Sequence, residues 1–231
     1  MFQVPEKATK KVADEPKGQP EEEKIEKELL TQLEQGDHQA VYKLWQRVKT
    51  MDRAPVVGLI EIVESMQKLG KPAAEIVGEI RSTMECNEAF TDSEIVGRLL
   101  DSLAKDGSME LLGPLVETAE ARDVPISVTV YETLIFKCFQ KQNFREVAKL
   151  EKRFRSLGLT LTPRMRMTLI STALRQSRLD EALEHLLQLP KTKAAAIPPQ
   201  VTSRLLSVAG KSQRLPEVVE KLKELQVSFD T

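Results

Sequence analysis

The chain has 231 residues, of which 41% are hydrophobic, 30% are charged and only 4% are aromatic. This composition can bury a substantial core, and no apolar run approaches the ~18 residues of a membrane span, so we expect a soluble protein. Cys86 and Cys138 lie far apart with no His-Cys cluster near either, which excludes a zinc-binding spacing and a disulfide framework. Because there is also no Gly-rich phosphate loop, Gly-x-Ser-x-Gly or His-Glu-x-x-His motif, we expect no enzyme, no cofactor and no metal site.

The formal net charge of −1 conceals a separation of charge along the chain. Residues 1–126 carry 16 Lys or Arg against 25 Asp or Glu, whereas residues 127–231 carry 18 against 10. Such blocks are commonly solvated faces, but a basic half on an elongated scaffold is also typical of a polyanion binder. Both interpretations stay open at this point.

The N-terminal third begins with residues 1–22, which are rich in Lys, Glu and Pro and predict a disordered charged tail. Residues 23–90 are expected to form two divergent helical hairpins, over about 22–50 and 55–85, with turns at Gly36 and Gly70. Trp45 falls on the apolar stripe of the first hairpin, so we expect it to be buried. His38 and His185 have no partner at catalytic spacing and are expected on the surface.

From residue 91 onwards the sequence repeats at intervals of 35, 35 and 36 residues, which is typical of a helical solenoid. The marker leucines of the four units are Leu99, Leu134, Leu169 and Leu205. In each unit the apolar residues follow the spacing of an amphipathic helix, stop at a short polar break and then resume. Each unit is therefore predicted to be helix, turn, helix, and stacked units are expected to share one continuous core.

Helix start signals agree with these periods. Ser127 precedes a predicted helix, and Thr162 places a capping hydroxyl before Pro163 at a first helical position. Residues 91–94 have the form of a capping box. We expect residues 91–231 to form the most regular part of the fold.

Several segments of the chain resemble the pentatricopeptide repeat family. They are Tyr131–Ile135, Phe144–Ala148, Leu157–Leu159 and Thr162–Pro163, with Arg178–Leu183 and Arg214–Val218 in the later units. The resemblance covers about residues 93–231 and implies an all-α fold, a right-handed α-solenoid of about six antiparallel helix hairpins. The tetratricopeptide repeat is the alternative, but its period is 34 residues, and it would place alanine where Phe154, Leu189 and Leu225 stand.

The resemblance implies binding of single-stranded RNA along the first helices, in RNA processing, stability or translation in a mitochondrion or chloroplast. In the family, a cation six residues after the marker leucine reaches a backbone phosphate; that slot holds Lys105, Gln140, Arg175 and Lys211. Such contacts give salt-dependent affinity, although a cation near a helix C-terminus also favours the helix dipole. Arg164, Arg166 and Arg204 on the same helices are expected to add phosphate contacts or stacking.

The positions that face a base in the family lie two residues before the marker leucine. They hold Gly97, Glu132, Met167 and Ser203. Glycine and methionine cannot hydrogen-bond a base edge through a side chain, and a carboxylate only accepts, so we expect mainly phosphate-backbone contacts. The alternative is a protein-binding α-solenoid adaptor or scaffold in an RNA–protein assembly, and no membrane or small-molecule partner is expected.

Two expectations concern the ends of the chain. Residues 21–23 are glutamates and Arg47 is the first arginine, so no transit peptide is visible in this chain. After Leu225 there is no polar helix to cap the last hairpin, and we therefore expect further repeats, a partner or a second copy to cover it.

Overall fold

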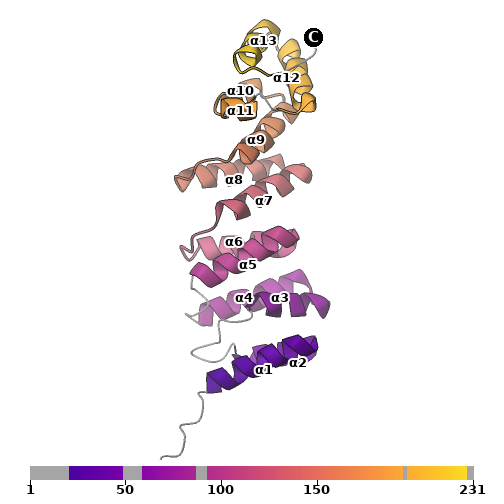
Figure 1. The fold of residues 1–231 in the computed structure, drawn as a ribbon, viewed down its shortest axis with the longest axis vertical. Helices are drawn as coiled ribbons and strands as arrows, with labels where there is room; N and C mark the ends of the chain where they lie inside the picture. The colour runs from indigo at the N-terminus through magenta and orange to yellow at the C-terminus, as the bar shows by residue number, and fades with distance from the viewer. Residues whose placement is uncertain (1–20, 49–58, 87–92, 195–196, 228–231) are drawn as a thin grey trace, which may run out of the picture.

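The computed structural model describes residues 21–48, 59–86, 93–194 and 197–227, and all regular structure in these ranges is helical. Figure 1 shows the helices stacked crosswise into a tall column that runs from the N-terminal helices to the C-terminal ones. The predicted all-α class is therefore confirmed. Within the described ranges, no helix is long and apolar enough to span a membrane.

Helix hairpins follow one another along the column, in the number that the sequence predicts. They pair α1 (Glu21–Gln35) with α2 (His38–Val48), α3 (Leu59–Lys68) with α4 (Ala73–Cys86), α5 (Ser93–Asp106) with α6 (Met109–Glu120), α7 (Val128–Gln140) with α8 (Phe144–Ser156), α9 (Pro163–Arg175) with α10 (Leu179–Leu187), and α12 (Pro199–Lys211) with α13 (Leu215–Glu224). The predicted N-terminal tail lies outside the described residues as far as residue 20. Helix α1 begins at Glu21, just before the expected end of that tail.

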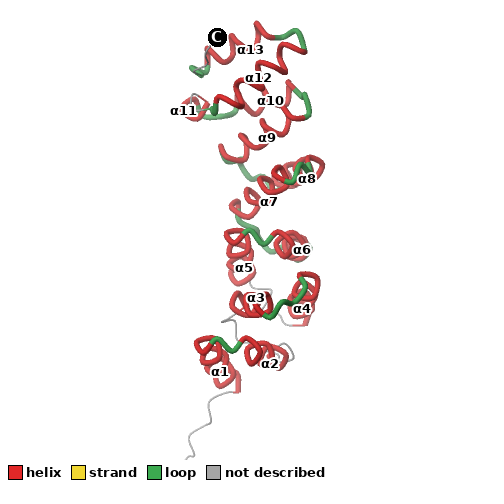
Figure 2. The backbone as a smooth tube through the Cα atoms, turned by 90° about the vertical axis from the view of Figure 1, so that its right-hand side faces the viewer, coloured by secondary structure: helices red, strands yellow, loops and turns green. Residues whose placement is uncertain are grey.

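The first helices of successive hairpins pack on one another and form a row. Helix α5 contacts α3 and α7, and α9 contacts α7 and α12. On the other side of the column α4 packs against α6, and in Figure 2 the helices α2, α4, α6 and α8 lie on the side opposite α1, α5 and α7. The first hairpin differs, because α2 contacts α3.

The repeat spacing of the sequence corresponds to equivalent places in the core. The four marker leucines, Leu99, Leu134, Leu169 and Leu205, are all buried. So are the residues thirteen positions later on the second helices, Leu112, Val147, Ala182 and Val218. Because both helices of every unit keep their apolar face in phase, each hairpin can stack on the next.

The turns between the two helices of each repeat have one shared backbone conformation. In each turn, one residue just after the first helix has a left-handed backbone conformation. These residues are Gly107 (φ 73°), Gln142 (57°), Ser177 (59°) and Gln213 (56°). The amide of the following residue bonds back to the carbonyl five residues earlier, as in Asn143 N to Cys138 O (2.9 Å) and Arg214 N to Ala209 O (2.9 Å). This arrangement satisfies carbonyls that a helix end would leave unpaired.

The predicted helix starts of the fourth and fifth hairpins are confirmed. The Ser127 hydroxyl accepts a hydrogen bond from the backbone amide of Val130 (3.3 Å), and Thr162 accepts one from Met165 (3.1 Å). Pro163 is the first residue of α9. The capping box at residues 91–94 begins outside the described residues and stays a prediction.

The fifth hairpin departs from the regular pattern. Helix α10 ends at Leu187, so Leu189, whose counterpart in the fourth hairpin is Phe154 on α8, lies beyond the end of its helix although it is buried. The cause is Pro190, which lacks an amide hydrogen and disfavours helical backbone in the residue before it. The short helix α11 (Lys191–Ala194) follows, and Ile197 returns the chain to the core.

The expectation of one continuous core is wrong. Among the residues that the structure describes, the buried apolar side chains form two clusters, one from Ile25 to Leu169 and one from Ile170 to Val227. Leu169 and Ile170 are adjacent on α9, so this helix contributes to both clusters. Trp45 is buried in the first cluster, as predicted.

Candidate nucleic-acid interface

From α5 onwards, each first helix presents the same four repeat slots to solvent. The slots lie five and two residues before the marker leucine and two and six after it, a spacing that places them on one helix face. They hold Glu94, Gly97, Asp101 and Lys105 on α5; Thr129, Glu132, Phe136 and Gln140 on α7; Arg164, Met167, Ser171 and Arg175 on α9; and Gln200, Ser203, Ser207 and Lys211 on α12, all exposed or half-buried. We call this set the first-helix face.

The three predicted phosphate-binding cations lie along one edge of the first-helix face. Lys105, Arg175 and Lys211 are exposed at the C-terminal ends of α5, α9 and α12, and Gln140 has the same place on α7. Since these helices pack side by side, the cations form a row at the ends that lead into the hairpin turns. Among the described residues, no carboxylate forms an ion pair with Lys105 or Lys211.

The other predicted arginines are distributed differently. Arg204 is exposed on α12, and Arg164 lies on the first-helix face, where it forms an ion pair with Glu132 (3.2 Å). Arg166 is half-buried and donates a hydrogen bond to the side chain of Gln188. Burial lowers the pKa of Arg166. It is thus engaged at the junction of α9 and α10, away from the row of exposed cations.

The base-facing positions provide few free hydrogen-bonding groups. Glu132 accepts a hydrogen bond from Thr162 (2.5 Å) in addition to its ion pair with Arg164. Gly97 and Met167 are half-buried, and Ser203 is exposed. The carboxylate of Glu132 therefore links α7 to the start of α9. Its two oxygens are already bound by Thr162 and Arg164.

Two half-buried phenylalanines on α7 lie against arginines of the candidate interface, and neither was predicted from the sequence. The guanidinium carbon of Arg164 lies 5.3 Å from the ring centroid of Phe136, and that of Arg175 lies 4.7 Å from the ring centroid of Phe139. Phe136 occupies a solvent-facing repeat slot that holds Asp101 and Ser171 in the adjacent units. An aromatic residue in that polar slot was the available signal.

The expectation that His185 lies on the surface is wrong. Its side chain is buried, its Nε2 lies 3.4 Å from a carboxylate oxygen of Glu151 on α8, and its Nδ1 has no hydrogen-bond partner among the described residues. The repeat alignment contained the signal, because His185 stands sixteen residues after its marker leucine, where Leu115 and Leu150 are buried in the preceding units. His38 is half-buried, and its Nδ1 lies 3.2 Å from the Ser65 hydroxyl.

His185 is part of a polar cluster between α8 and α10. Ligand atoms of Glu151, Glu181 and His185 all lie within 4.8 Å of one another, a grouping that could hold a metal ion. However, Arg155 pairs with Glu151 (2.8 Å) and Arg178 pairs with Glu181 (2.7 Å). Because the guanidinium groups already neutralise both carboxylates, the cluster is better suited to joining the two helices.

The buried histidine should make stability depend on pH. Burial lowers the pKa of His185 from its ordinary 6.5, more strongly than the attraction of Glu151 raises it, and Arg155 also lowers it. As the pH falls below about 6.5, the unfolded chain takes up a proton that the folded chain resists. We expect the free energy of unfolding to fall by up to about 1.4 kcal/mol per pH unit through this group.

Urea denaturation of wild type and His185→Gln at pH 7.5 and pH 5 measures this contribution. The variant should lose this part of the pH dependence, whereas the control His38→Gln should retain it. Equal pH dependence in wild type and His185→Gln would show that the histidine does not contribute.

Comparisons with known proteins give matches among solved structures alone. No family model matches the chain, and no curated protein matches it. The chain is similar to the pentatricopeptide repeat protein PPR10 in complex with an 18-nt psaJ RNA element, with 16% identity and a TM-score of 0.44. A cysteine-to-serine variant of that protein in complex with RNA matches with the same values. Each match covers 89% of this chain and 30% of the other, so the chain spans less than a third of that protein's length.

Proposed function

We propose that the chain binds single-stranded RNA along the first-helix face, mainly through contacts with phosphates. The observation that carries this proposal is the row of exposed Lys105, Arg175 and Lys211 on α5, α9 and α12, which form one packed row of first helices together with α7. Cations arranged along a groove or face can follow a phosphate backbone, and the affinity they supply is independent of sequence. The charge of residues 127–231, 18 Lys or Arg against 10 Asp or Glu, favours the same ligand.

Aromatic rings beside the cations support a nucleic-acid ligand. Phe136 and Phe139 are half-buried and lie against Arg164 and Arg175. A base can stack on an aromatic ring or on a guanidinium plane without hydrogen-bonding its edge. Since Glu132 is occupied by Thr162 and Arg164, we propose binding with little preference for sequence.

Titration of RNA binding with salt tests the proposal. The full chain should bind a labelled 20-nucleotide oligouridine with micromolar or weaker affinity at low salt. The three phosphate contacts of Lys105, Arg175 and Lys211 should contribute about −2 to the slope of log K against log salt, at roughly −0.7 each. If no binding is measured at 50 mM salt, the proposal is wrong, and the protein-binding adaptor becomes the better hypothesis.

The cellular setting is part of the proposal through the resemblance to pentatricopeptide repeats. We propose a role in RNA processing, stability or translation in a mitochondrion or chloroplast. Cell fractionation of the protein expressed from its full gene tests the compartment. Recovery in the cytosol alone would contradict this part.

A further inference from the structure

A second basic surface lies outside the first-helix face, along α8. A groove of about 480 Å³ lies between this helix and the turn that joins α9 to α10. It is lined by the cations Arg145, Lys149, Lys152 and Arg178, together with Phe144, and no carboxylate lines it. We call it the α8 groove.

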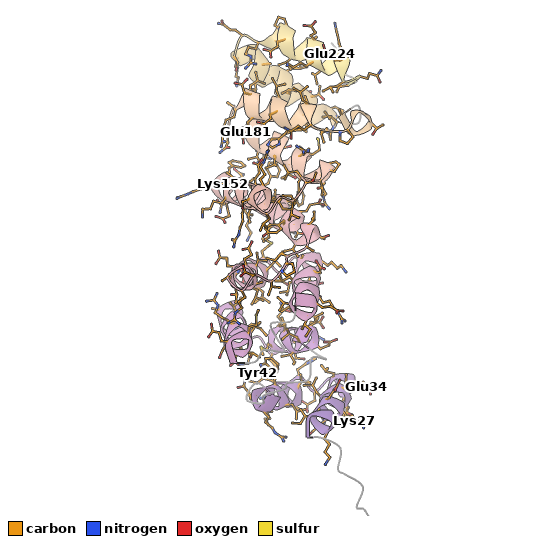
Figure 3. All side chains as sticks on the ribbon, turned by 90° about the vertical axis from the view of Figure 1, so that its left-hand side faces the viewer. Lys27, Glu34, Tyr42, Lys152, Glu181 and Glu224 are labelled. Atoms are coloured by element: carbon orange, nitrogen blue, oxygen red, sulfur yellow. The ribbon has the colours of Figure 1, made fainter. Side chains whose placement is uncertain are left out.

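The cations of the α8 groove are placed by helix periodicity. Arg145, Lys149 and Lys152 are spaced i, i+4 and i+7, so they share one face of α8 and extend over about 10 Å. All three are exposed, and in Figure 3 Lys152 projects away from the column. The groove therefore presents a line of positive charge to solvent.

Two of these cations are free of ion pairs within the described residues. Lys149 pairs with Glu146 (3.0 Å) and Arg178 pairs with Glu181 (2.7 Å), but none of the described carboxylates pairs with Arg145 or Lys152. The existing pairs are solvent-exposed, and such pairs contribute little to stability. An anionic ligand can thus bind Arg145 and Lys152 without displacing a partner.

The α8 groove is connected to the first-helix face by aromatic rings. Arg175 lies over Phe139, and the ring centroid of Phe139 is 6.4 Å from that of Phe144, which lines the groove. A strand that runs from Arg175 to the groove would therefore pass over the hairpin turns that join α7 to α8 and α9 to α10. An acidic peptide could bind the cations, but it would leave the rings of Phe139 and Phe144 without a stacking partner. The two neighbouring rings therefore favour a ligand that carries both phosphates and bases.

A comparable groove at the turns of the second to fourth hairpins is less suited to an anion. It is also about 480 Å³, but Glu110 lines it together with Lys71, Lys137 and Lys141. Lys71 is already bound to Glu75 and lies 4.1 Å from the ring centroid of Tyr42. The α8 groove is thus the stronger candidate.

We propose that the α8 groove binds the phosphate backbone of the same RNA strand after the strand passes Arg175. The inference rests on the proposed function and extends it, since the strand turns over the edge of the column instead of remaining on the first-helix face. Arg145 and Lys152 contact two further phosphates. A longer RNA is consequently bound more tightly, and with a steeper dependence on salt, than the first-helix face alone allows.

The test compares Arg145→Gln/Lys152→Gln with the control Lys43→Gln/Lys223→Gln, in which two exposed lysines on α2 and α13 are neutralised. Circular dichroism first establishes that both variants unfold like wild type. With the 20-nucleotide oligouridine, the groove variant should lose about 1.4 from the magnitude of the salt slope and more than about tenfold in affinity at 50 mM salt. The control should change affinity by less than about twofold.

The outcomes separate this inference from the proposed function. If wild type binds the RNA and the groove variant behaves like its control, the inference is wrong and the proposed function stands. If a polyglutamate peptide of 20 residues competes with the RNA as strongly as unlabelled oligouridine does, the groove belongs to an acidic protein. If wild type does not bind RNA, both proposals are overturned.

Discussion

Replacing Lys105, Arg175 and Lys211 together with glutamine should weaken RNA binding by about 100-fold at 50 mM salt and remove about 2 from the magnitude of the salt slope. The reason is that each phosphate contact releases condensed counterions, a gain that is largest when salt is scarce. Glutamine is the appropriate substitute because Gln140 already occupies the equivalent slot on α7. The local helix end therefore tolerates it.

The effect should be the same for every RNA sequence, because phosphates carry no sequence information. Electrophoretic or anisotropy titrations with oligouridine and oligoadenosine at 50 and 200 mM salt provide the measurement. The matched control replaces Lys24, Lys43 and Lys223, three exposed lysines on α1, α2 and α13. A slope that changes equally in both triple variants would mean that net charge, and not the row of cations, governs binding.

Phe154→Ala should destabilise the protein by about 3–5 kcal/mol, the cost of removing a large ring from a well-packed core. Phe154 is fully buried, and its ring meets that of Tyr131 edge to face with centroids 5.4 Å apart. The Tyr131 hydroxyl donates a hydrogen bond to Glu120, which in turn pairs with Arg153. The cavity would therefore lie where the third and fourth hairpins are joined.

The control Leu157→Ala removes a large apolar side chain just beyond α8, where it is 56% exposed. It should lower the free energy of unfolding by less than about 0.5 kcal/mol.

Hydrogen exchange tests whether the two core clusters unfold separately. Phe154→Ala should reduce amide protection in α7 and α8 more than in α12 and α13, since Phe154 belongs to the cluster that ends at Leu169. Equal loss in both regions would show that the clusters unfold as one unit.

Most of the fold could be predicted because its signal is repeated. A single apolar stripe is ambiguous, but Leu99, Leu134, Leu169 and Leu205 recur in phase, and each occupies a buried place on a first helix. The shortened α10 could not be foreseen from that period, because Pro190 acts locally on one unit. The division of the core was not predicted either, although His185, in a slot that holds leucine in two preceding units, marks a polar contact between α8 and α10.

The candidate site was predicted less completely than the fold. Position in the repeat was enough to place Lys105, Arg175 and Lys211 on one edge. It was not enough for Arg166, whose side chain turns toward Gln188, or for Glu132, which bonds to Thr162 thirty residues away. Those outcomes depend on side-chain partners from neighbouring hairpins, and the sequence does not specify them.

The opposite charges of the two ends of the column give the molecule a permanent electric dipole along its long axis. The helices before residue 127 carry the acidic excess, and those after it carry the basic excess. In the field of a highly charged strand, such a molecule rotates before it collides, with its α7–α13 end leading. Collisions in the wrong orientation become rarer, so the rate of capture should decrease as added salt shields the field.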